Sequence, residues 1–135
     1  MLGLDPDLVF RSHGCEAQIN RRYRTTPEAF EPCAGDTLAA LRTLSASCRF
    51  DVPEGLPPAL AFLVGFFGYE TVALVEHLPR APASDLDLPE MLFVRPSVLL
   101  VFDNLSDELF VTAPVWPEQV AGDAASALSR AEDRI

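Results

Sequence analysis

The residues that could carry out chemistry are few, and their spacing separates them. His13 and His77 are the two imidazoles. We expect His13 beside a turn and His77 at the C-terminal end of a short helix, where a positive charge suits the helix dipole. Cys15 lies near Ser12 along the chain, but neighbouring positions of a strand point to opposite faces, so we do not expect them to pair as a nucleophile and its base.

The acidic residues are no better placed for catalysis or for metal binding. Glu70 and Glu76 are six positions apart, so on a helix they point to different sides and make a poor acid and base pair. Asp85, Asp87 and Glu90 could bind a hard cation only if carbonyl groups and a second carboxylate converged on them. We expect an exposed acidic loop there, and the sequence predicts no catalytic, cofactor-binding or metal-binding residue.

Two glycines and an aromatic residue form the most conspicuous local motif. Gly65, Gly68 and Tyr69 lack the further glycine and the lysine of a phosphate-binding loop. We instead expect the glycines to let a strand and a helix pack closely, with Tyr69 filling the joint while its hydroxyl finds a partner.

The only basic cluster consists of Arg21, Arg22 and Arg24. It is typical of a solvated surface loop, and contact with a partner domain or subunit is the alternative. The cysteines at 15, 33 and 48 are odd in number and lack paired metal-type spacing, so we expect reduced thiols and neither a disulfide framework nor a zinc site.

Composition limits the class of protein. The chain has 135 residues, 49% hydrophobic and 22% charged, which is typical of one globular domain. Its net charge is −10, with ten arginines and no lysine, so it should repel nucleic acid. The uncharged stretch 55–69 is too short for a membrane helix, and the N-terminus lacks the pattern of a secretion signal. We expect a cytoplasmic protein without a membrane or nucleic-acid partner.

Several elements can be predicted from local patterns. Residues 8–12 and 15–20 flank Gly14 and predict a hairpin. Asp36 can cap a helix that runs to about Arg49, with apolar residues at helical spacing on one face. The run from Ala59 to Phe67 is apolar throughout except for Gly65, which predicts a strand buried on both faces.

The second half of the chain continues this mixture. A short helix is expected over 69–77, stopped by Pro79. Residues 91–94 and 97–102 are expected as strand split by Arg95 and Pro96, with 108–112 as the antiparallel partner. The alanine-rich tail 118–135 predicts a helix. The fold class is therefore α+β, an antiparallel sheet with two hairpins and a central apolar strand, flanked by two or three helices.

Four short motifs occur in an order that resembles a known family, the N-terminal domain of anthranilate synthase component I, a chorismate-utilising enzyme. The longest is Gly65-Phe66-Phe67-Gly68-Tyr69-Glu70-Thr71-Val72, followed by Val75-Glu76-His77-Leu78-Pro79. The others are Leu4-Asp5-Pro6-Asp7, Leu88-Pro89-Glu90-Met91 and Val101-Phe102-Asp103-Asn104. Each motif alone has low specificity, but the ordered set covers most of the chain.

The resemblance implies a function for a longer protein. The full-length enzyme converts chorismate to anthranilate in tryptophan biosynthesis, with magnesium and with ammonia from a glutaminase subunit, component II. Its catalytic and magnesium-binding residues lie in a C-terminal domain that has no counterpart in this sequence, nor does the Leu-Leu-Glu-Ser type motif of its tryptophan feedback site. Residues 1–135 are thus expected to be a partial, regulatory or scaffolding N-terminal domain, cut at both ends and without a catalytic role.

The partners expected from this resemblance are the catalytic C-terminal domain of the same polypeptide and the glutaminase subunit. We also expect the isolated chain to associate with itself. Two other functions remain open: the N-terminal domain of aminodeoxychorismate synthase component I in the folate pathway, and a stand-alone, non-catalytic interaction module.

Overall fold

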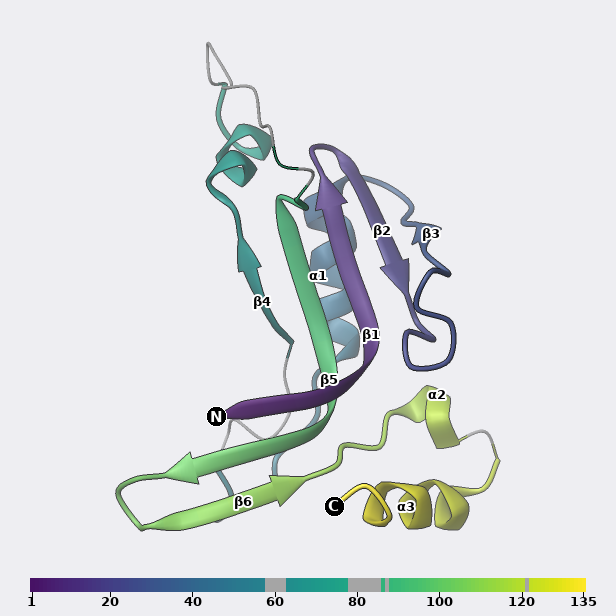
Figure 1. Ribbon diagram of the computed structural model, residues 1–135, viewed down its shortest axis with the longest axis vertical. Helices are drawn as coiled ribbons and strands as arrows, with labels where there is room; N and C mark the ends of the chain where they lie inside the picture. Colours follow the sequence, from purple (N-terminus) through teal and green to yellow (C-terminus); the bar gives the residue numbers. More distant parts are fainter. Residues whose placement is uncertain (58–62, 78–85, 87, 121) are drawn as a thin grey trace.

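The computed structural model describes residues 1–57, 63–77, 86, 88–120 and 122–135 and forms an antiparallel sheet with helices beside it (Figure 1). The sheet has six strands in the order β3-β2-β1-β5-β4, and β6 pairs with β5. The strands are β1 (Leu2–His13), β2 (Glu16–Asn20), β3 (Glu31–Pro32), β4 (Val64–Phe67), β5 (Met91–Asp103) and β6 (Glu108–Thr112). The helices are α1 (Thr37–Ser47), the 3₁₀ helix η1 (Tyr69–Leu74), α2 (Pro117–Val120) and α3 (Ala124–Glu132). The predicted α+β class is confirmed.

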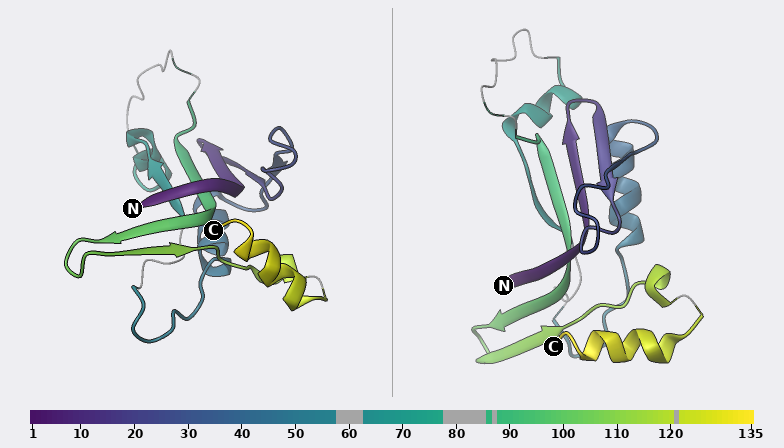
Figure 2. Two further views of the ribbon diagram at one scale, coloured as in Figure 1. Left: turned by 60° about the horizontal axis from the view of Figure 1, so that its bottom comes forward. Right: turned by 45° about the vertical axis from the view of Figure 1, so that its right-hand side comes forward.

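The two long strands, β1 and β5, bend together in their middle. Their pairing register shifts between Pro6 and Leu8, and Pro6 lies opposite Pro96. A proline cannot donate a ladder hydrogen bond, so facing prolines weaken the ladder there, and a shift of this kind turns the strands. Figures 1 and 2 show the lower halves of both strands turning away from the upper sheet. The expected break at Arg95 and Pro96 is therefore a bend within one continuous strand.

Both predicted hairpins are present. In the first, β1 pairs with β2 around Gly14, whose φ is +53°, a conformation in which glycine carries no steric cost. In the second, β5 pairs with β6, and Asp103 lies opposite Glu108. The Asp103 carboxylate accepts from the amides of Leu105 and Ser106, and these bonds hold its pKa below the usual range.

The core lies between α1 and one face of the sheet. Asp36 caps α1 by accepting from the Ala39 amide at 2.8 Å, and the helix ends at Ser47 with Cys48 as its C-cap, close to the predicted end. The buried core residues come from β1, β2, α1 and the segment before α2: Leu8, Phe10, Ala17, Ile19, Leu44, Cys48 and Trp116. Figure 1 shows α1 behind β1 and β5.

The opposite face of the sheet is covered only in part. On β1 and β2 it is covered by the 21–30 loop: the Asn20 amide donates to the carbonyl oxygens of Thr26 and Pro27, and the Arg11 guanidinium lies 3.8 Å from the Phe30 ring centroid. On β4 and β5, the register places Val64 beside Val94 and Phe66 beside Leu92. We call these four residues the open sheet face, because Val64 and Phe66 are 40% and 45% exposed.

The prediction of a central strand buried on both faces is wrong. The apolar strand is β4 at the edge of the sheet, and all four of its residues are exposed. Residues 58–62 of the predicted strand lie outside the described part of the chain. The apolar pattern shows that this strand has side chains that favour burial on both faces. Within the described residues, however, β4 has a neighbouring strand on one side only.

The glycines do allow a close approach, but the backbone that approaches them belongs to β5 and the segment before it and not to the expected helix. A Cβ added to Gly65 would lie 2.0 Å from the Leu92 carbonyl oxygen, and one added to Gly68 would lie 2.9 Å from that of Glu90. Both glycines thus allow close approach to the segment that enters and forms β5, and Gly68 also lies close to the Glu70 side chain of η1. Tyr69 does not fill a joint, since it is 79% exposed.

The remaining helix predictions are corrected in detail. The helix after Gly68 is 3₁₀ and ends at Leu74, so His77 lies beyond it and not at its C-terminal end. The tail forms two helices, because Gly122 adopts φ +90° and Asp123 then caps α3. Of the described helices, none is long and apolar enough to cross a membrane.

Candidate functional site

The structure does not assemble the suggested nucleophilic group. Ser12 is buried, whereas Cys15 is exposed in the turn between β1 and β2. All three cysteines are free thiols. Nothing in this arrangement activates a nucleophile.

One pocket does gather three of the titratable candidates. His13, Glu70 and Glu90 line a hollow of about 370 Å³ beside η1, and Glu76 and His77 do not. Glu90 has a structural contact, because its Oε2 accepts from the Gly14 amide at 2.9 Å and so ties the first hairpin turn to the start of β5.

The acidic and basic candidates are also dispersed. Asp85 and Asp87 lie outside the described residues, and within the described part no three His, Cys, Asp or Glu side chains could together hold a metal ion. Of the arginine cluster, Arg24 forms an exposed ion pair with Asp5 at 2.7 Å. Arg21 lines a separate hollow beside α1.

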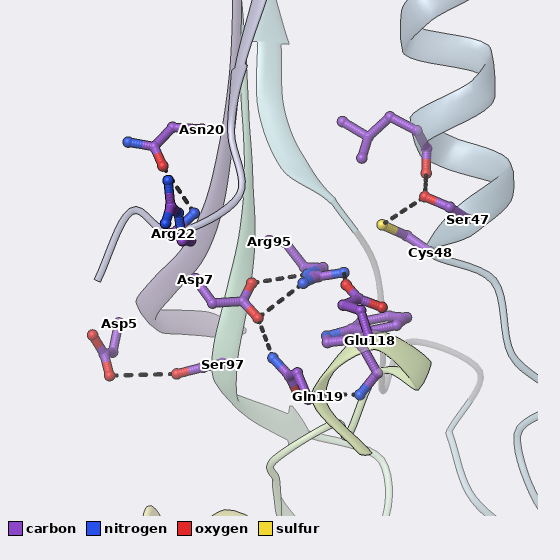
Figure 3. A network of polar contacts seen from close by, with 12 residues as sticks. Asp5, Asp7, Asn20, Arg22, Ser47, Cys48, Arg95, Ser97, Glu118 and Gln119 are labelled. Atoms are coloured by element: carbon purple, nitrogen blue, oxygen red, sulfur yellow. Dashed lines mark hydrogen bonds and ion pairs between the residues drawn. The ribbon is translucent and has the colours of Figure 1, made fainter. Parts of the chain in front are cut away.

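A polar cluster lies at the bend of the sheet. We call it the bend cluster, and it consists of Asp7, Arg95, Trp116, Glu118 and Gln119 (Figure 3). Asp7 comes from β1 beside the register shift, Arg95 from β5, and Glu118 and Gln119 from α2. The cluster therefore joins three elements that are far apart in the sequence.

Arg95 is the centre of the bend cluster. Its Nε and Nη2 donate to the two carboxylate oxygens of Asp7 at 2.8 and 3.0 Å, and its Nη1 donates to Glu118 at 2.7 Å. The two-pronged contact is the geometry in which a guanidinium binds a carboxylate most strongly. Gln119 donates to Asp7 as well and accepts from the Trp116 amide.

Arg95 and Asp7 are the buried members of the cluster, whereas Glu118 is exposed. The Arg95 side chain is 4% exposed. Burial lowers the pKa of Arg95, but hydrogen bonds and charge from Asp7 and Glu118 raise it above its usual value. Burial likewise raises the pKa of Glu118, whereas hydrogen bonds and the charges of Arg95 and Arg21 lower it below its usual value.

Trp116 closes the cluster on the core side. Its buried ring lies under Arg95, with 4.6 Å from the guanidinium carbon to the ring centroid, and packs edge-on against Phe50. Every guanidinium nitrogen of Arg95 has a partner. The bend cluster thus fixes the bend and holds α2 against the sheet, and it presents no nucleophile or open coordination position.

The bend cluster was missed by sequence reasoning, although one signal was available. Arg95 interrupts an apolar strand, and a charge in a buried strand requires a partner. Asp7 is 88 positions away, so the identity of that partner could not be read from local patterns.

Comparison with known proteins relates the whole chain to one enzyme family. The chain is 39% identical over all 135 residues to anthranilate synthase component 1 of Cereibacter sphaeroides, covering 27% of that protein. It is 37% identical over 101 residues to the protein of the same name from Streptomyces coelicolor, covering 75% of the chain and 20% of the relative. No protein-family profile matches the chain.

A solved structure agrees at the level of the fold. Anthranilate synthase component I from Streptococcus pneumoniae TIGR4 superposes with a TM-score of 0.67 over 99% of this chain and 29% of that one, at 19% identity. The chain spans about a quarter of the length of the relatives it matches. Sequence and fold together relate this chain to the N-terminal part of the anthranilate synthase component 1 family.

Proposed function

We propose that this chain is the non-catalytic N-terminal part of an anthranilate synthase component 1, in which it supports a catalytic part that follows it. Similarity along the whole chain to proteins of that name carries the proposal. Conversion of chorismate to anthranilate would then belong to the complete cytoplasmic protein in tryptophan biosynthesis.

The open sheet face supports a scaffolding role. Val64 and Phe66 expose apolar side chains beside Leu92 and Val94, and Figure 1 shows no described helix in front of β4. Exposed apolar patches of this kind mark surfaces that bind another protein unit. We infer that the catalytic part of the same polypeptide covers this face.

The other components of the reaction are proposed to lie outside this chain. Among the described residues, no group of three or more His, Cys, Asp or Glu side chains could hold a metal ion. We propose, from the similarity to anthranilate synthase component 1, that magnesium is bound by the catalytic part. From the similarity to anthranilate synthase component 1, we also propose that a glutaminase subunit binds the complete protein.

A chimera tests the proposal. The first quarter of the Cereibacter sphaeroides relative is replaced by residues 1–135, and anthranilate formation from chorismate, magnesium and ammonia is followed by fluorescence. We expect the chimera to be active and the relative without its first quarter to be inactive. A Phe66→Glu chimera should lose most of the activity, whereas a Leu105→Glu chimera, altered in the exposed β5–β6 turn, should keep it. A soluble, inactive chimera would contradict the proposal.

A further inference from the structure

A hollow lies between α1 and the strands β2 and β3, on the side of the sheet away from the open sheet face. Its volume is about 460 Å³, within the range of small-molecule sites. The buried side chains of Phe10, Ile19 and Leu44 form its floor, and Ala40 extends the apolar wall. We call it the α1 pocket.

The polar groups of the α1 pocket are few, and most are engaged. The hydroxyls of Thr43 and Ser47 donate to carbonyl oxygens of their own helix, those of Ala39 and Leu44. Cys33 is half-buried, and burial raises the pKa of its thiol more than the charge of Arg21 lowers it. The thiol is therefore neutral at pH 7.

Arg21 is the remaining strong donor at the pocket. Its guanidinium makes no hydrogen bond or ion pair with the part of the chain that the structure describes, although its charge acts on Cys33 and on Glu118. Glu118 is already paired with Arg95 at 2.7 Å. Glu31, also at the pocket, adds one negative charge, which disfavours ligands with two anionic groups.

We propose that the α1 pocket binds a small monocarboxylic acid with an apolar body, with Arg21 holding the carboxylate and the floor of the pocket holding the hydrocarbon. A guanidinium matches the geometry of a carboxylate, and an apolar floor favours a hydrocarbon over water. The inference is independent of the proposed function, because it uses residues of this chain alone.

Three matched probes test the chemistry. 4-Phenylbutanoate, 4-phenylbutanamide and 4-phenylbutylamine share one hydrocarbon body and differ in the charge of the head group. They are titrated into the 135-residue chain and followed by amide chemical shifts. We expect saturable shifts at Cys33, Ala34 and Thr43 with the carboxylate only. Equal binding of the amide or the amine, or no binding of the carboxylate at millimolar concentration, would overturn the proposal.

Two variants and a control locate the site. Arg21→Gln should weaken carboxylate binding about tenfold or more, since it removes the charged hydrogen-bond donor for the carboxylate. Ala40→Leu, which fills the pocket without changing charge, should also abolish the shifts. Arg22→Gln is the control, because Arg22 does not line the pocket. This variant should bind the carboxylate probe with the affinity of the wild type. Unchanged binding in Arg21→Gln, or equal loss in Arg22→Gln, would refute the role of Arg21.

Cysteine modification supplies an independent readout. Bound carboxylate should slow the reaction of Cys33 with N-ethylmaleimide and leave exposed Cys15 unaffected. If the two cysteines are protected equally or not at all, the ligand is not in the α1 pocket.

Discussion

Arg95 shows how one residue can determine the shape of the sheet. It lies next to the facing prolines and joins β1 to α2 through Asp7 and Glu118. Removing one partner of a buried ion pair leaves the other charge without compensation, which costs about 3–5 kcal/mol. We therefore predict that Arg95→Met lowers the free energy of unfolding by about 3 kcal/mol or more, as measured by urea titration.

A matched control shows whether the loss of stability comes from the burial of the ion pair or from the removal of a charge. Arg24→Met removes an arginine from the exposed pair with Asp5, and exposed pairs contribute about 1 kcal/mol or less. Equal losses in the two variants would show that the Asp7–Arg95 pair is not buried in solution.

Glu118 predicts how the stability of the chain responds to acid. Its pKa is lowered in the folded chain, so its contribution is fully present above the unfolded value of about 4.3 and is lost as the pH falls through the lower folded value. We predict that Glu118→Gln is less stable than the wild type at pH 7 and that the difference shrinks as the pH falls and disappears below the folded pKa. Urea titrations across this range measure it. Exposed Glu54 supplies the control Glu54→Gln, and a difference independent of pH would contradict the prediction.

For single residues, the sequence shows which side chains need a partner but does not show which residue that partner is. The absence of a catalytic group was argued from spacing alone, whereas the bend cluster required contacts between residues 7, 95 and 118. Tyr69 illustrates the limit, since an aromatic residue beside a glycine was expected to be buried and is largely exposed.

Among the elements, β4 depends on a single glycine. A side-chain carbon at Gly65 would overlap the Leu92 carbonyl oxygen and the Phe93 side chain of β5. We predict that Gly65→Ala detaches β4 from β5 and raises amide hydrogen exchange across Val64–Phe67. Val64→Ala is the control on the same strand, and it should retain protection. Unchanged exchange in Gly65→Ala would mean that β5 shifts to make room.

Elements defined by local rules were predicted well, and those defined by distant contacts were not. The two hairpins and α1 follow from turn residues, a cap and helical spacing, all within a few positions. The edge position of β4 depends on β5, which lies a long way down the chain. The tail was predicted as one helix because its alanines are at helical spacing. The positive φ of Gly122, which separates the two helices, could not be read from that spacing.

The whole molecule predicts an inactive chain. In the pocket lined by His13, Glu70 and Glu90, the Glu90 carboxylate already accepts a hydrogen bond from the Gly14 amide. The bend cluster has no reactive group. We predict that the isolated 135-residue chain forms no anthranilate from chorismate, magnesium and ammonia. Fluorescence above a control without protein would show that a catalytic site has been overlooked.

The open sheet face predicts that isolated chains associate with one another. β4 is an edge strand with exposed apolar side chains, and such an edge offers both unpaired backbone groups and apolar surface to a second copy. A two-fold arrangement would place the same face of each chain against the other. The net charge of −10 opposes non-specific precipitation without preventing a specific pair.

Sedimentation over about a hundredfold range of concentration tests this association, because mass action makes the dimer fraction rise with concentration. Phe66→Glu places a charge on the open sheet face and should yield a monomer, since burying an unpaired carboxylate in the interface is costly. Leu105→Glu alters an exposed apolar residue in the β5–β6 turn and should leave the dimer intact. A wild-type chain that stays monomeric and binds no hydrophobic dye would mean that the described fold covers its own apolar surface.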